Sequence, residues 1–137
     1  MDIMARKEIL ASFRHIAVVG ISPRAERPSN SVSRYMVQHG YIIYPVNPAH
    51  DEIIGLRCYP SLSSMPPEIS KKIEIVNIFR KSSDIMPIVD EAIGIRAKVI
   101  WMQLGISNAA AAEKARKAGL LVVENCCIAV DHQHLFQ

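Results

Sequence analysis

Short runs of apolar, β-branched residues alternate along the chain with longer stretches whose apolar residues recur at helical spacing. Each run is almost continuously apolar, as is typical of a strand buried on both faces of a sheet. Five runs are predicted as strands, at residues 15–20, 41–46, 73–79, 98–102 and 120–123. The alternation predicts an α/β, Rossmann-like fold: a doubly wound, five-stranded parallel sheet with helices on both faces, in three layers.

Capping residues define the limits of two predicted helices. The helix after the first strand is predicted at residues 31–39, and Gly40 supplies the left-handed residue that ends it. Pro87 fits only the first turn of a helix, because its missing N–H costs nothing there. The helix after the third strand is therefore expected to be capped by Ser83 or Asp84.

The remaining segments lie towards the two ends of the chain. A short amphipathic helix is expected before the first strand, and Asn108 is predicted to cap an alanine-rich helix that Gly119 ends. After Asn125 we expect an irregular polar tail. His132 and His134 would lie on one side of this extended tail, and its polarity explains them more simply than a metal site does.

Length and composition limit the classes of protein that this chain can represent. With 137 residues, half of them hydrophobic, the chain is expected to form a single domain over 1–137. A net charge of +3 is too weak to favour a nucleic-acid partner. No apolar run approaches the roughly 20 residues that span a bilayer, and the first residues lack the apolar block of a secretory signal. Three cysteines are an odd count and favour reduced thiols. From the missing apolar segments and the reduced thiols together, we expect a cytoplasmic protein without a membrane partner.

The carboxyl ends of the predicted strands carry most of the conspicuous glycine and polar residues. Doubly wound sheets bind ligands outside these ends, where the winding reverses direction. Each residue has a simple alternative role in a turn, but their common position on one edge favours a site. The ends in question are residues 20–22, 46–48, 79–81, 103–105 and 124–126.

Of these segments, the loop at residues 20–31 has the most polar and charged groups that could bind a ligand. It enters a helix through Ser29, Asn30 and Ser31, whose hydroxyl and N–H groups suit an anion, and Arg24 and Arg27 add positive charge. A phosphate or pyrophosphate is the expected ligand, although at least one of the serines would serve as an ordinary helix N-cap. The loop is not the G-x-G-x-x-G fingerprint.

The end of the second strand argues against a nicotinamide dinucleotide. An NAD site usually has an acidic residue there for the ribose hydroxyls, whereas this chain has Asn47 between Val46 and Pro48. The Pro-Val-Asn-Pro segment at 45–48 offers an apolar wall that suits an adenine ring better. NAD is therefore disfavoured.

Several of these segments together resemble a known family. Arg-Pro-Ser at 27–29, Pro-Val-Asn-Pro at 45–48, Phe-Arg at 79–80 and Gln-Leu-Gly at 103–105 occur in the order and spacing of the small stand-alone CoA-binding proteins. These are similar to the CoA-binding domain of the succinyl-CoA synthetase alpha subunit. The resemblance covers nearly the whole chain from Ile9 onward, and it implies the same doubly wound sheet.

The resemblance implies that CoA or acyl-CoA lies across the strand ends. Its phosphates would lie near the first loop, its adenosine part near 45–48, and its pantetheine arm near 103–105, while Arg80 could pair with a phosphate. The implied binding residues are Gly20, Ile21, Ser22, Arg27, Ser29, Asn30, Pro45, Asn47, Pro48, Phe79, Arg80, Ile85, Gln103 and Gly105. Asn30 and Glu26 depart from the aromatic residue and the aspartate that are frequent in the family. The larger synthetases use a phosphorylated histidine in a second domain, which this chain lacks, so their activity is not carried over.

No catalytic constellation is evident from the residues. Cys126 could form a mixed disulfide with the CoA thiol or act as a nucleophile only if its pKa were lowered, and a small buried residue is the simpler interpretation. Trp101 is expected in the core. The sequence favours a CoA- or acyl-CoA-binding protein without catalysis of its own. The alternatives are a subunit or partner-dependent form of an acyl-CoA or CoA-ligase-type enzyme, or an NAD(H) or nucleotide sensor, and a homodimer or an enzyme partner is possible with each.

Overall fold

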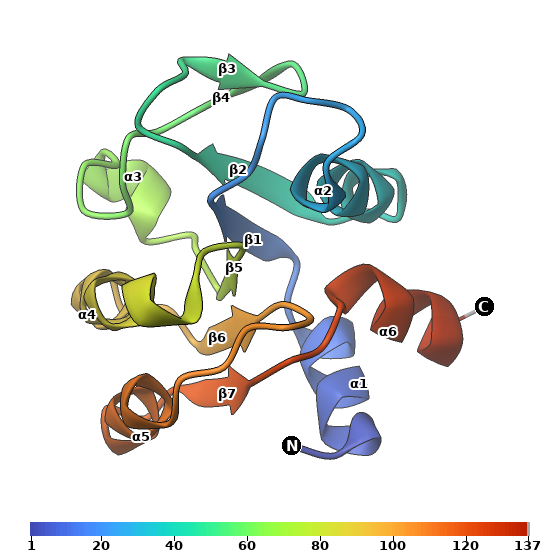
Figure 1. Ribbon diagram of the computed structural model, residues 1–137, viewed down its shortest axis with the longest axis vertical. Helices are drawn as coiled ribbons and strands as arrows, with labels where there is room; N and C mark the ends of the chain where they lie inside the picture. The colour runs from blue at the N-terminus through green and yellow to red at the C-terminus, as the bar shows by residue number, and fades with distance from the viewer. Residues whose placement is uncertain (137) are drawn as a thin grey trace.

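Five strands form one parallel sheet in the computed structural model, which describes residues 1–136 (Figure 1). Their spatial order is β2-β1-β5-β6-β7, and every neighbouring pair is parallel. The bounds are β1 His15–Val19, β2 Ile42–Val46, β5 Ile75–Ile78, β6 Val99–Met102 and β7 Leu121–Val123. Four of them are one residue shorter than predicted and share one end with the prediction, whereas β5 is three residues shorter than the predicted 73–79 and lies inside it. The predicted fold class is confirmed.

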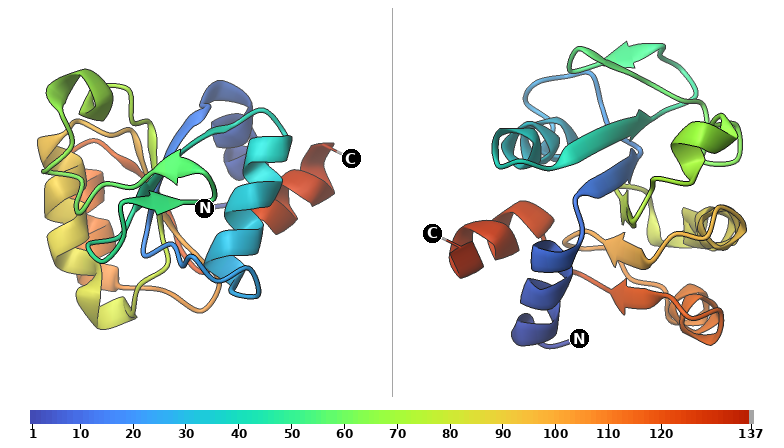
Figure 2. Two further views of the ribbon diagram at one scale, coloured as in Figure 1. Left: turned by 90° about the horizontal axis from the view of Figure 1, so that it is seen from above. Right: turned by 180° about the vertical axis from the view of Figure 1, so that it is seen from behind.

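Helices cover both faces of this sheet and complete three layers (Figure 2). One face carries α1 Ile3–Ser12, α2 Pro28–Gln38 and α6 Ile128–Phe136. The opposite face carries α3 Pro67–Ser70, α4 Ile85–Gly94 and α5 Ala109–Lys117. No helix within residues 1–136 combines the length and the apolar character that crossing a membrane requires.

Two apolar clusters hold the layers together, one on each face of the sheet. Successive side chains of a strand point to opposite faces, so Val76 and Ile100 pack towards α4 and α5, whereas Ile75 and Trp101 pack towards the other face. Trp101 is fully buried, as predicted. Both faces of each central strand are therefore buried, which explains its continuous apolar sequence.

Most predicted helix limits agree with the structure. Asn108 caps α5 by accepting a hydrogen bond from the Ala111 N–H, and Gly40 and Gly119 adopt positive φ just after α2 and α5. The start of α2 was predicted three residues too late, because Pro28 already occupies its first turn. A short 3-10 turn, η1 Ser82–Asp84, precedes α4, and Asp84 is its N-cap without a side-chain hydrogen bond.

Three elements were not predicted, and one prediction was wrong. The chain between β2 and β5 forms a small antiparallel hairpin, β3 Glu52–Ile53 and β4 Leu56–Arg57, followed by α3. The residues after Asn125, expected as an irregular tail, form α6. Groups distant in sequence hold this helix, since Gln103 Oε1 accepts a hydrogen bond from the Ile128 N–H.

The winding of the chain reverses between β1 and β5. The chain leaves β1 for β2 on one side and later returns to β5 on the other. Gly20 ends β1 with φ of +89°, and a Cβ there would lie 2.5 Å from the Phe79 carbonyl oxygen at the end of β5. Only glycine permits this approach of the two strand ends.

This approach generates a stability prediction. Gly20→Ala should lower the free energy of unfolding by about 2–4 kcal/mol, because it adds a clash with backbone to the strain of positive φ. Gly119→Ala is the matched control, since Gly119 has φ of +91° but open space around its Cβ position. It should cost about 1–2 kcal/mol. Urea unfolding of both variants measures the difference, and equal losses would contradict the proposed close contact.

Candidate functional site

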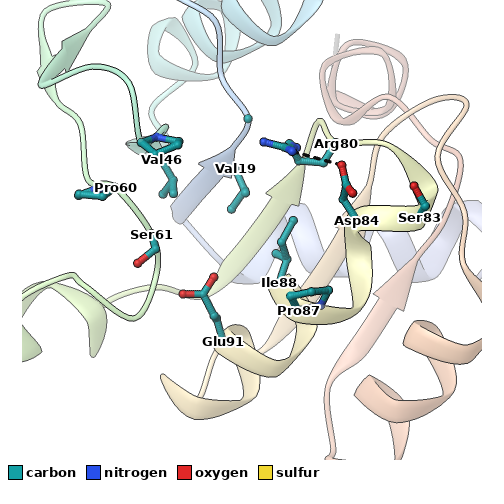
Figure 3. Close-up of a pocket in the computed structure, with 12 residues that line it drawn as sticks. Val19, Val46, Pro60, Ser61, Arg80, Ser83, Asp84, Pro87, Ile88 and Glu91 are labelled. Atoms are coloured by element: carbon teal, nitrogen blue, oxygen red, sulfur yellow. Dashed lines mark hydrogen bonds and ion pairs between the residues drawn. The ribbon is translucent and has the colours of Figure 1, made fainter.

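A pocket of about 350 Å³ opens at the carboxyl ends of the strands, beside the reversal point (Figure 3). Its walls come from the ends of β1 and β2, from residues 60–61 and from the first turns of α4. The lining residues are Val19, Gly20, Val46, Pro48, Pro60, Ser61, Arg80, Ser83, Asp84, Pro87, Ile88 and Glu91. The structure thus brings Gly20, Pro48 and Arg80 of the predicted site together around one cavity.

The wall at residues 60–61 was missed by sequence reasoning. Tyr59 pairs with the end of β2 in a parallel bridge, donating its N–H to Pro45 and accepting from the Asn47 N–H. This pairing carries Pro60 and Ser61 to the sheet edge. No periodic pattern marks the segment, because its position depends on β2 rather than on its own residues.

The loop between β1 and α2 is held by side chains that were predicted to bind an anion. Ser29 Oγ accepts a hydrogen bond from the Ser22 N–H at 2.9 Å, and the Asn30 side-chain amide donates to the Ser22 carbonyl at 2.9 Å. Arg34 Nε in turn donates to Asn30 Oδ1. Ser29 and Asn30 are only 6% and 3% exposed. Both side chains are therefore buried under the loop and hold its backbone at Ser22.

Exposed positive charge lies on the outer side of the same loop. Arg27 is exposed at the N-cap of α2 and makes no side-chain capping bond. Arg24 is exposed as well and pairs with Glu26 at 2.8 Å. Ser22 is half-buried, and its hydroxyl accepts a hydrogen bond from the Arg24 N–H. The side chains accessible to an anion here are therefore those of Arg24 and Arg27, next to the N-terminus of α2.

Asn47 connects the ends of β1 and β2. Its side-chain amide donates to the Ile21 carbonyl at 2.9 Å, and its Oδ1 accepts from the Ala49 N–H at 2.8 Å. Ile21 and Pro45 are buried beneath this connection, whereas Pro48 is exposed and lines the pocket. Asn47 thus joins the segment after β1 to the segment after β2 at this edge of the sheet.

Arg80 supplies the cation on the opposite side of the pocket. Its guanidinium pairs with the Asp84 carboxylate at 3.2 Å, and the two side chains are 46% and 41% exposed, so the pair is weakly held (Figure 3). Phe79 is half-buried beside it. Ile85 is fully buried in the apolar cluster under α4 and supports this wall rather than facing the cavity.

The turn after β6 has a different organisation from that expected. Gln103 is buried, and its Oε1 accepts a hydrogen bond from the Ile128 N–H at 3.0 Å. Gly105 lies in an exposed turn and donates its N–H to Asn125 Oδ1 at 2.6 Å. Gln103 therefore points to the start of α6, whereas Gly105 remains at the surface near Leu104.

Cys126 follows the end of β7, and its surroundings do not favour a thiolate. Burial raises the pKa of the Cys126 thiol, although the nearby Arg6 opposes this, and its Sγ donates to the Glu124 carbonyl at 3.3 Å. A raised pKa disfavours the reactive thiolate at neutral pH. Within residues 1–136, no group of three or more His, Cys, Asp and Glu side chains is placed to hold a metal ion.

The structure is a doubly wound α/β domain with a pocket at its reversal point, lined by Arg80, and with Arg24 and Arg27 exposed on the neighbouring loop. This is the position at which such sheets usually bind ligands. Comparison with known proteins makes this class more specific. Residues 14–133 match the model of the CoA binding domain family. The chain belongs to that family.

Two kinds of protein are similar to this chain in sequence: proteins of about the same length, and enzymes that are much longer. The chain is 40% identical over 126 residues to the uncharacterized protein YneT of Bacillus subtilis, covering 92% of this chain and 90% of YneT. The solved structure of a hypothetical protein from Pyrococcus horikoshii is 41% identical, with a TM-score of 0.93, and the match covers 100% of this chain and 94% of that one. An ADP-forming acetate–CoA ligase of Archaeoglobus fulgidus is 37% identical over 62 residues, which are 44% of this chain but 9% of the ligase.

The role of Asn47 can be tested by removing only the hydrogen-bond donor of its side chain. Asn47→Asp places a carboxylate against the Ile21 carbonyl in place of the amide N–H, and should lower the free energy of unfolding by about 1–3 kcal/mol at pH 7. Asn125→Asp is the matched control, because Asn125 uses its side chain as an acceptor for Gly105 and an aspartate preserves that role. Its unfolding free energy should change by less than about 0.5 kcal/mol. Similar urea midpoints for the two variants would remove Asn47 from this role.

Proposed function

We propose that the chain binds CoA or acyl-CoA across the carboxyl ends of its strands and catalyses no reaction by itself. The observation that carries the proposal is the pocket at the reversal point between Gly20 and Arg80. Its position is the usual one for a ligand of a doubly wound sheet. Membership of the CoA binding domain family supports CoA as that ligand.

The charges favour one orientation of the ligand. The phosphates would lie against Arg24, Arg27 and the first turn of α2, where the helix dipole also favours negative charge. The adenosine part would rest on the wall of 45–48, and Arg80 would exchange its exposed pairing with Asp84 for a phosphate. The pantetheine arm would then run towards the exposed turn at Gly105.

The predicted binding residues divide into two roles in this proposal. Gly20, Ser22, Arg27, Pro48, Phe79, Arg80 and Gly105 would contact the ligand. The buried residues Ile21, Ser29, Asn30, Pro45, Ile85 and Gln103, together with Asn47, would hold those contacts in place. Substitution of residues in either set should weaken ligand binding, but only substitution in the second set should also lower the free energy of unfolding.

A ligase-type assembly is the second candidate function. The similarity to ADP-forming acetate–CoA ligases supports it, although the chain spans only 9% of the length of the first of these. In that case a separate enzyme would supply the catalytic groups, because the Cys126 thiol has a raised pKa. A nicotinamide sensor gains no support from Asn47, whose side chain is already bonded to Ile21 and Ala49. A cytoplasmic location remains an expectation from the sequence.

Calorimetric titration of the purified, reduced chain tests the proposal. CoA and acetyl-CoA should bind, 3′-dephospho-CoA should bind more weakly because it lacks one phosphate, and NAD⁺ should not bind. The same samples are assayed for acyl-CoA turnover. Absence of CoA binding would refute the proposed ligand, and turnover by the chain alone would refute the proposal that it is not an enzyme.

Arg80 provides the sharpest mutational prediction. Arg80→Ala should weaken CoA binding by about 1.5–3 kcal/mol, through loss of a charge-assisted bond to phosphate. Asp84→Asn should strengthen binding, since it releases Arg80 from its present partner. Lys81→Ala removes an exposed neighbouring cation and should change the affinity by less than about 0.5 kcal/mol. An unchanged dissociation constant for Arg80→Ala would place Arg80 outside the site.

A further inference from the structure

The start of α6 is bonded to the turn after β6, beside the proposed site. At the first residue of α6, the Ile128 N–H donates to Gln103 Oε1 at 3.0 Å. In the segment that leads into α6, Asn125 Oδ1 accepts from the Gly105 N–H at 2.6 Å, and the Cys126 carbonyl accepts from the indole N–H of Trp101 in β6 at 2.8 Å. The Gln103 side chain is thus held by the first residue of α6, and the segment that leads into α6 holds Gly105.

The middle of α6 is anchored by a buried histidine. His132 is 8% exposed, and its Nδ1 lies 2.8 Å from the Tyr35 hydroxyl on α2 in a hydrogen bond. Its ring meets Tyr41 edge-on, with centroids 5.6 Å apart, and stacks on Phe136 at 5.0 Å. One imidazole therefore connects α6 to α2 and to the start of β2.

The groups around His132 are mostly cationic or aromatic. From α2, the His39 ring lies 5.1 Å from the His132 ring, beside Tyr35. Arg14 lies over Tyr41, and Lys7 of α1 lies over Phe136. On α6 itself the adjacent Asp131 is already paired with Arg6 at 2.6 Å. Burial, and then the charges of His39 and Arg14, lower the pKa of His132.

We propose that α6 is a pH-sensitive clasp on the proposed CoA site, released by protonation of His132. The inference rests on the proposed function only in naming the ligand that the clasp would regulate. Undocking exposes the imidazole and restores its ordinary proton affinity, so undocking is coupled to proton uptake. Docking is therefore fully favoured above the ordinary histidine pKa of about 6.5 and is progressively disfavoured as the pH falls below it.

Release of the clasp would act on the ligand through the turn at 103–105. Docked α6 holds the Gln103 side chain through the Ile128 N–H, and the segment that leads into α6 holds the Gly105 N–H through Asn125. Undocked, the turn would have to be ordered by the ligand, and that ordering costs affinity. Acidification should therefore weaken CoA binding beyond the effect of protonating CoA itself.

Hydrogen exchange measures docking without any ligand. The reporters are the Ile128 amide and the indole N–H of Trp101, the single tryptophan of the chain. After correction for intrinsic exchange, their protection factors should fall by up to about tenfold from pH 7.5 to pH 5.5, the limit set by one histidine with an exposed pKa near 6.5. Unchanged protection would overturn the proposal.

Three variants assign the effect to His132. His132→Phe, with His132→Gln measured alongside in case the larger change disturbs folding, should make the protection of both reporters nearly independent of pH. His134→Asn alters an exposed histidine of the same helix and should preserve the wild-type profile. His39→Asn should preserve a pH dependence as well, because burial is the largest cause acting on His132. Loss of the dependence in His39→Asn would assign the switch to His39 and refute the proposal.

The final comparison concerns CoA itself. The ratio of the CoA dissociation constant at pH 5.5 to that at pH 7.5 should be larger for the wild type than for His132→Phe. Comparing the two ratios cancels the titration of CoA's own phosphates, because that titration affects both proteins equally. Equal ratios, together with a pH-dependent exchange profile, would refute the regulation of the site. If CoA does not bind at either pH, the proposed function fails, while the exchange profile still decides whether the clasp exists.

Discussion

The close approach of β1 and β5 at their carboxyl ends is the constraint on which the site depends. Gly20 must pass so near the Phe79 carbonyl that any side chain would collide with backbone. This contact fixes the separation of the loop that begins at Gly20 from Arg80, which follows Phe79 directly. The position of Arg80 relative to the loop that carries Arg24 and Arg27 is thus set by packing of backbone on backbone, which deforms less than packing between flexible side chains.

The parts of the fold that could be predicted are those that local sequence determines. The runs ending at Gly20, Val46 and Met102 are apolar on both faces of the sheet, and their periodicity needs no knowledge of their neighbours. The helix α6 could not be predicted in this way. Its docking depends on partners far away in the chain, such as Gln103 for Ile128 and Arg6 for Asp131.

The candidate site shows the same division. Gly20, Pro48 and Arg80 were placed at one cavity because the ends of parallel strands share an edge. Residue type could not distinguish a polar group that meets a ligand from one that supports the loop. Ser29 and Asn47 were both predicted as binding residues, yet each is bonded to backbone at the end of β1. That distinction depends on the direction of each side chain, which becomes visible only in three dimensions.

The arrangement of charge in the pocket limits which part of a ligand can lie against α4. Asp84 and Glu91 line that wall, and Arg80 is the cation that stands between them and the strand ends. A phosphate placed deep against α4 would meet the Glu91 carboxylate with no counter-charge, which is unfavourable in a partly enclosed site. In the proposed binding mode the phosphates would therefore lie between Arg80 and α2, and the wall at α4 would contact uncharged groups of the ligand. Arg80 follows Phe79 directly, so in this proposal the cation that would meet the phosphates is positioned by the same close approach of β1 and β5 that requires glycine at position 20.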